Sequence, residues 1–132
     1  MIQFSFIIPV YNRPHQIKEL LESFKALKYS SAYEIVIVED GSTICSSEIV
    51  ASYQDVLDIS YYQKPNSGPG DSRNFGMNLA KGNYYIILDS DVLLPPDYLE
   101  HVSAFLKHSY VDCFGGADAA HHSFTNLQKA IN

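Results

Sequence analysis

The sequence contains little cysteine and little positive charge. Its two cysteines, Cys45 and Cys113, stand alone without C-x-x-C spacing, which excludes a disulfide framework and argues against a zinc or redox motif. We expect both thiols to be structural and reduced. Nine Lys and Arg face fifteen Asp and Glu, giving a formal net charge of −6. This balance leaves no broad basic face for phosphates, so a nucleic-acid partner is disfavoured.

Long hydrophobic runs are absent as well. The first residues, Met1 to Gln3, form no basic leader, and Pro9 interrupts the first apolar run. The sequence therefore predicts neither a signal peptide nor a membrane span, and we expect a cytoplasmic protein. With 132 residues, of which 46% are hydrophobic, the chain can build the core of one domain or of part of one.

Short apolar runs typical of buried strands alternate with segments of helical periodicity. We predict strands at Phe4–Val10, Glu34–Val38, 57–62, Tyr84–Leu88 and Val111–Phe114, and helices at 14–28, around 49–53, from Asp71 or Ser72 past Leu79, and at 98–106. Such alternation implies right-handed βαβ units. The predicted fold class is α/β, with a mainly parallel sheet between layers of helices.

Two residues at predicted helix ends suggest specific local roles. Asn12 precedes Pro14, a residue suited to a first helical turn, so Asn12 is a candidate helix cap. Gly82 follows the third helix, where a left-handed backbone conformation often ends a helix.

Polar residues follow three of the predicted strands. They are Pro9–Asn12, Glu39–Ser42 and Asp89–Asp91. Ligands of parallel α/β sheets bind beyond the carboxyl ends of the strands, so these loops should converge on one site.

The carboxylates of these loops allow both a chemical and a structural interpretation. Asp89 and Asp91 could hold a hard divalent cation and leave positions open for a diphosphate, or they could only satisfy loop amides. Asp40 could accept hydrogen bonds from a base or ribose, or cap the next segment. Because successive residues point in different directions, only one of Glu39 and Asp40 should face the crevice.

Other candidates are weaker on their own. Arg73 could pair with phosphate or with a surface acid, and Tyr11 could stack on a base or pack at the rim. Gly68-Pro-Gly70 resembles a phosphate loop but lacks the spacing of either common nucleotide fingerprint. His121 and His122 are adjacent, without metal-ligand spacing, and we assign them no role.

Four motifs in order resemble glycosyltransferase family 2, whose members have the GT-A fold, a three-layer α/β/α sandwich with Rossmann-like topology. They are FIIPVYNR at 6–13, VEDGS at 38–42, NSGPGDSRNFG at 66–76 followed by Ala80 and Gly82, and LDSD at 88–91. The match extends from Phe4 to at least Leu99.

The resemblance implies binding of a nucleoside-diphosphate sugar, often a UDP-sugar, with Mg²⁺ or Mn²⁺, and transfer to a saccharide or glycoconjugate acceptor in polysaccharide or glycoconjugate assembly. Pro9 and Tyr11 would lie against the base, Asp40 near uracil or ribose, and Arg73 near the nucleotide. Asp91 would be the metal ligand, and Asp89 would contact the ribose or the metal's water shell. The resemblance also assigns Asn12, Glu39, Asn66, Gly70 and Ser90 to the donor site.

The chain departs from the family pattern in two respects. Glu39 replaces the usual first Asp of an acidic pair, a mild change because the carboxylate is retained. Family domains also continue past this length and supply a carboxylate base there; Asp118 is a poor candidate for that base. Because Phe124, Leu127 and Ile131 keep helical spacing to the last residue, we expect residues 1–132 to be the nucleotide-sugar-binding part of a longer GT-A domain.

Alternative functions remain at this point. The chain could bind a nucleotide sugar without transferring the sugar. It could be a phosphohydrolase with Asp89 as nucleophile, although that chemistry is expected after the first strand rather than the fourth. It could also be a purely structural fragment. Because acceptors of this family are commonly membrane-linked, peripheral contact with the cytosolic membrane face also stays open.

Overall fold

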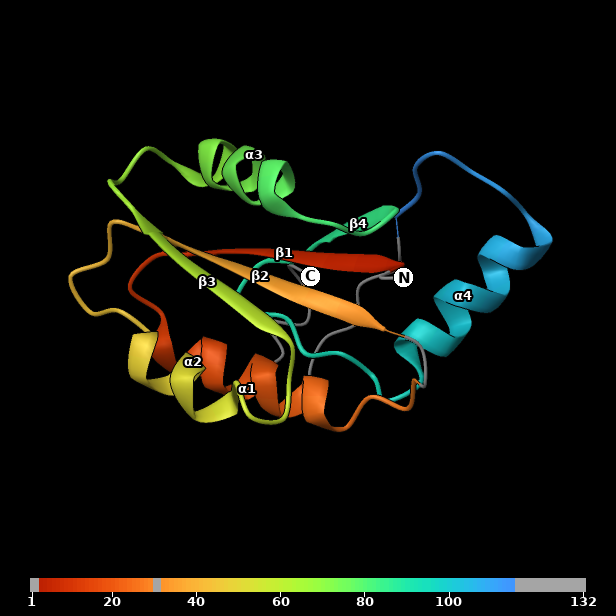
Figure 1. Ribbon diagram of the computed structural model, residues 1–132, viewed down its shortest axis with the longest axis horizontal. Helices are drawn as coiled ribbons and strands as arrows, with labels where there is room; N and C mark the ends of the chain where they lie inside the picture. The colour runs from red at the N-terminus through yellow and green to blue at the C-terminus, as the bar shows by residue number, and fades with distance from the viewer. Residues whose placement is uncertain (1–2, 30–31, 116–132) are drawn as a thin grey trace, which may run out of the picture. The chain divides into compact units, whose positions relative to one another are not determined.

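The structure, a computed structural model, describes residues 3–29 and 32–115. They fall into two units, one reaching Val102 and one beginning at Ser103. The first unit is built on a four-stranded sheet in which every pairing is parallel. Its strands are β1 (Phe4–Val10), β2 (Tyr33–Asp40), β3 (Ile59–Lys64) and β4 (Tyr84–Ile87), in the order β3-β2-β1-β4 (Figure 1).

Helices cover both faces of this sheet. The first two, α1 (Pro14–Lys25) and α2 (Ser47–Tyr53), lie on one face, and α3 (Pro69–Leu79) lies on the other (Figure 1). A fourth helix, α4 (Tyr98–His108), crosses the boundary between the two units. The α/β class and the parallel sheet predicted from the sequence are thereby confirmed.

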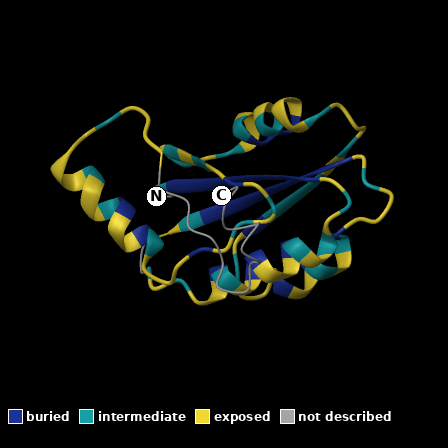
Figure 2. Cartoon of the chain, turned by 180° about the vertical axis from the view of Figure 1, so that it is seen from behind, coloured by how far each residue is buried: buried dark blue, intermediate teal, exposed yellow. Residues whose placement is uncertain are grey.

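The core lies on both sides of β1 and β2, which are buried almost throughout (Figure 2). Side chains alternate across a strand, so Ile7, Val36 and Val38 form one cluster beneath α3. On the opposite face Phe6 packs edge-on against Phe24 of α1, with ring centroids 4.7 Å apart. Continuous apolar runs therefore mark these strands because both of their faces are covered.

Several element boundaries differ from the prediction. Helix α1 ends at Lys25 rather than Lys28, because the Lys28 amide donates to the Pro96 carbonyl instead of a helical carbonyl. Helix α3 begins at Pro69 rather than at Asp71 or Ser72. The fixed backbone of proline suits a first helical position, and Gly68 before it adopts a φ of 99°.

Gly82 has a different role from the predicted helix terminus. It does not adopt a positive φ, and α3 already ends at Leu79. A side chain here would place its Cβ 2.6 Å from Ser5 Oγ and 2.9 Å from the Phe4 carbonyl carbon. Glycine is needed because the chain passes directly against β1.

The predicted strand at Val111–Phe114 is wrong. Residues 109–115 have no regular secondary structure, and no described strand pairs with them. All of Val111–Phe114 except Val111 are exposed, and a strand without a neighbour gains no ladder hydrogen bonds. Asp118, the two histidines and the predicted last helix lie outside the described residues. Within the described ranges, none of the helices has the length and apolar character needed to cross a bilayer.

Candidate functional site

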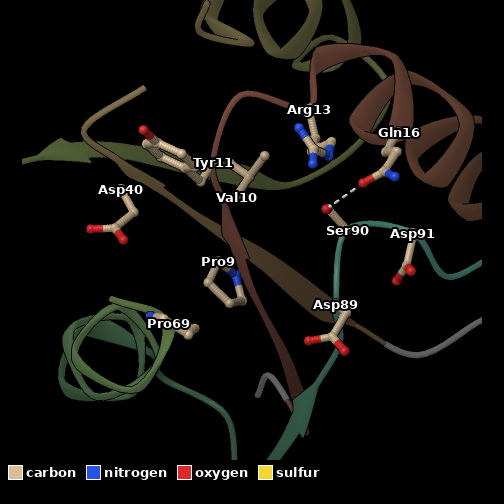
Figure 3. Close-up of a pocket in the computed structure, with 10 residues that line it drawn as sticks. All are labelled: Pro9, Val10, Tyr11, Arg13, Gln16, Asp40, Pro69, Asp89, Ser90 and Asp91. Carbon is tan, nitrogen blue, oxygen red and sulfur yellow. Dashed lines mark hydrogen bonds between the residues drawn. The ribbon is translucent and has the colours of Figure 1, made fainter. Parts of the chain in front are cut away.

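The strand order reverses beside β1, since β2 and β3 lie on one side of it and β4 on the other. Such a reversal opens a crevice beyond the carboxyl ends of the two strands that flank it. The structure has a cavity of about 470 Å³ at this point, within the size range of small-ligand sites. Its lining consists of Pro9, Val10, Tyr11, Arg13, Gln16, Asp40, Pro69, Asp89, Ser90 and Asp91 (Figure 3).

The predicted convergence of three polar loops is therefore seen in the structure. Pro9, Tyr11, Asp40, Asp89, Ser90 and Asp91 all line the cavity, whereas Asn12, Glu39, Asn66, Gly70 and Arg73 do not. Val10, Arg13, Gln16 and Pro69 also line the cavity, although none of them was predicted individually as a site residue. Val10 and Arg13 could have been predicted to line the cavity, because they lie close to Tyr11 at the end of β1.

Asn12 connects the ends of β1 and β2 instead of capping a helix. Its backbone is left-handed, with φ 51°, a conformation that asparagine tolerates better than most residues. Its Oδ1 accepts hydrogen bonds from the Thr43 amide at 2.9 Å and the Ile44 amide at 3.0 Å. Helix α1 begins after Arg13 without a side-chain cap. Asn12 thus fixes the position of Tyr11, which is 50% exposed at the cavity wall.

Asp40 ends β2 and organises the loop before α3. One oxygen accepts from Lys64 Nζ at 2.6 Å and the Ser67 amide at 2.9 Å; the other accepts from the Gly68 amide at 3.0 Å and Asn66 Nδ2 at 3.3 Å. A carboxylate offers about four lone-pair sites, so this one is saturated. Asn66 therefore acts on the site through Asp40.

The electrostatics of Asp40 follow from these contacts. Burial raises the pKa of its carboxyl group, but the Lys64 ammonium and the Ser67 and Gly68 amides outweigh burial and hold this pKa below its ordinary value. The ion pair with Lys64 is nearly inaccessible, with 9% and 6% of the two side chains exposed. Asp40 is consequently a charged, rigid part of the cavity wall.

Glu39 points to the opposite face of the sheet and does not line the cavity. Its Oε1 accepts from the Ser46 amide and hydroxyl, each at 2.8 Å, and from the Tyr61 hydroxyl at 2.7 Å, and Ser42 donates to Oε2. This internal network, not a donor contact, accounts for an acid that is only 1% exposed. The expectation that Glu39 binds the donor is corrected accordingly, and Asp40 is the acid of the pair that faces the crevice.

The acidic loop after β4 has an open side. Asp89 pairs with Arg73 of α3, 3.3 Å from its Nη2, and both side chains are partly exposed. Arg73 Nε is buried and lacks a hydrogen-bond partner among the described residues. Asp91 is exposed and also lines the cavity. Arg73 can therefore reach the loop, and part of its hydrogen-bonding capacity is unused.

Asp89 and Asp91 are the residues of this loop whose carboxylates could hold a cation. Carboxylate oxygens suit Mg²⁺ or Mn²⁺, and Mg²⁺ is usually held by one or two carboxylates together with substrate phosphates. No cluster of three or more His, Cys, Asp or Glu capable of holding a metal occurs within residues 3–29 and 32–115. The described residues therefore form no closed protein cage for a metal.

Comparison with known proteins gives a consistent result. The family model "Glycosyl transferase family 2" matches residues 5–131. The chain is 32% identical over 115 residues to poly(ribitol-phosphate) β-N-acetylglucosaminyltransferase TarS of Staphylococcus aureus, covering 85% of this chain and 20% of the relative. It is 38% identical over 95 residues to glycosyltransferase GlyA of Streptococcus pneumoniae, covering 71% of this chain and 14% of the relative.

Solved structures share the fold. A crystal structure of S. aureus TarS 1–349 in complex with UDP-GlcNAc superimposes with a TM-score of 0.79 at 30% identity, covering 89% of this chain and 38% of that one. The mannosyltransferase PcManGT of Pyrobaculum calidifontis, in complex with GDP-Man and Mn²⁺, gives a TM-score of 0.72 at 24% identity over 79% of this chain and 32% of that one. The chain spans about a fifth or less of the curated relatives named above.

Proposed function

Because the chain belongs to glycosyltransferase family 2, we propose that it forms the donor-binding part of an enzyme that transfers a sugar from a nucleoside-diphosphate sugar to an acceptor hydroxyl. The observation that carries this proposal is the meeting of the β1, β2 and β4 ends around one cavity at the strand-order reversal. The UDP-GlcNAc complex of TarS supports a uridine nucleotide as the donor. The TarS name supports a glycoconjugate acceptor.

The cavity offers separate surfaces to the two ends of such a donor. Tyr11 and Pro9 provide an aromatic and an apolar surface for the base. Asp40, saturated by its own loop, shapes the wall beside them. Arg13 lines the cavity and Arg73 lies within 3.3 Å of Asp89, so guanidinium groups are available to diphosphate oxygens.

Charge balance favours a metal ion in this site. Lys64 neutralises Asp40, Arg73 pairs with Asp89, and Arg13 and Asp91 add one charge of each sign, so the cavity has no excess positive charge for a diphosphate. We propose that Asp91, with Asp89, holds Mg²⁺ or Mn²⁺ together with the diphosphate. Such an ion, when bound, offsets the negative charge that develops on the departing diphosphate.

The proposed reaction proceeds with inversion. The acceptor oxygen forms a bond to the anomeric carbon while the bond from that carbon to the diphosphate oxygen breaks, and a carboxylate base takes the hydroxyl proton. Arg73 and Arg13 would stabilise the leaving group by hydrogen bonding. We assign no base among the described residues: of the carboxylates that line the cavity, Asp40 is saturated, and Asp89 and Asp91 are the proposed metal ligands.

Calorimetric titration of UDP into the 132-residue chain, with and without Mn²⁺, tests this function. We expect binding that requires Mn²⁺, is lost in Asp91→Ala and is weakened in Asp40→Ala. Asp55→Ala is the matched control, since this substitution removes the same charge from an exposed position that does not line the cavity. If the chain bound none of UDP, GDP and dTDP in the presence of Mn²⁺ or Mg²⁺, the proposal for this chain would be contradicted.

A second measurement separates transfer from binding alone. Donor binding without release or transfer of sugar is the alternative function. Incubation with UDP-GlcNAc, Mn²⁺ and poly(ribitol-phosphate), the acceptor in the name of TarS, followed by quantification of free UDP, distinguishes the two. Binding without UDP release assigns this chain to donor recognition.

A further inference from the structure

Residues 90–96 are attached to α1 at three points. Ser90 Oγ donates to Gln16 Oε1 at 2.8 Å, the Leu94 amide donates to Ser23 Oγ at 3.2 Å, and the Lys28 amide, just beyond α1, donates to the Pro96 carbonyl at 2.7 Å. Residues 90–96 run in the same direction as α1, because later residues of this segment contact later residues of the helix. The seven residue steps from Gln16 to Ser23 along the helix span about 10 Å, close to the reach of about 13 Å for the four steps of extended chain from Ser90 to Leu94.

Only the first of these contacts lies in the cavity wall. Gln16 and Ser90 both line the cavity, whereas Ser23 and Leu94 do not. Ser90 is the middle residue between Asp89 and Asp91, and its hydroxyl is turned toward Gln16 (Figure 3). On the strand side, the Leu88 amide donates to the Ile7 carbonyl at 3.0 Å. The two acids are therefore held between an attachment to β1 and an attachment to α1.

Each acid has few restraints of its own. Asp91 is exposed, and 68% of the Asp89 side chain is accessible despite its contact with Arg73. A shared cation needs both carboxylates at one defined separation before it binds, otherwise ordering the loop reduces the affinity. Within the loop, the Val92 amide donates to the Asp89 carbonyl at 3.4 Å. The Gln16–Ser90 hydrogen bond ties the residue between the two acids to α1, and it joins residues 74 positions apart.

We propose that Gln16 is a positioning residue for the acidic loop: through Ser90 it sets the relative placement of the Asp89 and Asp91 carboxylates before a metal-bound nucleotide enters. This inference rests on the proposed function of the same cavity. It assigns Gln16 no contact with the reacting atoms. Partners that orient metal ligands from outside commonly change metal affinity by tenfold or more when they are removed.

The test combines two readouts on the same variants, Gln16→Leu, Ser90→Ala and the double variant. Amide hydrogen exchange of residues 88–94 measures the restraint without any ligand. Calorimetry measures UDP affinity with Mn²⁺ and, separately, uridine affinity without metal. We expect each single variant to exchange faster across residues 88–94 and to bind Mn²⁺-UDP about tenfold more weakly. Uridine affinity should fall by much less than the affinity for Mn²⁺-UDP.

Two controls distinguish positioning from general destabilisation. Ser90→Thr keeps the hydroxyl and should therefore retain both the slow amide exchange of residues 88–94 and the affinity for Mn²⁺-UDP. Ser23→Ala removes the next attachment along α1, which lies outside the cavity wall, and should speed exchange at Leu94 without a tenfold loss of affinity. The double variant should lose no more affinity than either single variant, because both changes remove one interaction.

Three results would overturn the inference: unchanged exchange in Gln16→Leu, additive losses in the double variant, or an equal loss of uridine affinity. Failure of the proposed function gives a different pattern. In that case the unsubstituted chain binds no nucleotide, while hydrogen exchange still reports whether Gln16 restrains the loop.

Discussion

Strand β2 carries three buried carboxylates, Glu34 near its amino end and Glu39 and Asp40 at its carboxyl end, and the purposes of Glu34 and Asp40 differ. Glu34, near the amino end, and Asp40, at the carboxyl end, are each 4% exposed. Glu34 accepts from the Ser5 hydroxyl and the Lys81 amide, which draws the connection between α3 and β4 against β1. Asp40 accepts from an ammonium group and loop amides, and it lines the cavity.

The difference between these ends follows from the direction of the chain. At the amino end, Gly82 passes so close to Ser5 that its amide donates to Ser5 Oγ at 2.8 Å. At the carboxyl end, β1 and β4 lie side by side where the strand order reverses, and the cavity lies beyond their ends. Glu34 and Asp40 are thus equally buried but differ in function, because the backbone around each of them follows a different path.

The largest effect should come from Asp40→Asn compared with Glu34→Gln. The first change leaves the Lys64 ammonium, in a side chain only 9% exposed, without its counter-charge. We expect a loss of about 3 kcal/mol in the free energy of unfolding. Gln at position 34 keeps an acceptor for Ser5 and Lys81, so we expect a loss of about 1 kcal/mol. Urea unfolding measures both; equal losses would remove the distinction between the two ends.

An intermediate effect should distinguish two glycines. Gly82→Ala places Cβ 2.6 Å from Ser5 Oγ and 2.9 Å from backbone atoms, and such crowding should cost about 2 kcal/mol. Gly70, in the first turn of α3 at the cavity end, has nothing within 4 Å of such an atom. Gly70→Ala should stabilise the protein by about 0.5 kcal/mol. Thermal unfolding of the two variants measures both effects. A loss of stability in Gly70→Ala would contradict the open character of the cavity end.

The smallest effect concerns pH. Because the pKa of folded Asp40 lies below its unfolded value of 3.8, its contribution is complete well above that value and disappears as pH falls through the folded pKa. The stability difference between the unsubstituted chain and Asp40→Asn should therefore be constant from about pH 7 to 5 and shrink below about pH 4. Urea titrations at several pH values test this, and a constant difference down to about pH 3 would refute it.

The sequence predicted those features that depend on residues close together in the chain. Apolar runs such as Phe4–Val10 predicted buried strands, and their polar ends predicted the cavity. The choice between Glu39 and Asp40 depended on which face of β2 lies beneath α3. That orientation is set by tertiary packing and shifts with a one-residue change of register, so the pattern alone left it open.

Other features depend on residues distant in the chain. Gln16 meets Ser90 across 74 positions, and no local signal in α1 indicates it. Gly82 was misassigned because helix termini and close backbone approaches both select glycine. Val111–Phe114 has the composition of a strand, but composition cannot supply a pairing partner.

The pairing of β1 with β4 has a consequence for the order of folding. Phe4 aligns with Tyr33 in β2, but it also aligns with Tyr84 in β4, so the second pairing closes a loop of 80 residues instead of 29. Loop-closure entropy makes the longer closure costlier by only about 0.9 kcal/mol. During synthesis, however, the acidic loop emerges after β1, β2 and β3, whose strands can already pair. The cavity is therefore completed in the final stage of assembly of this sheet.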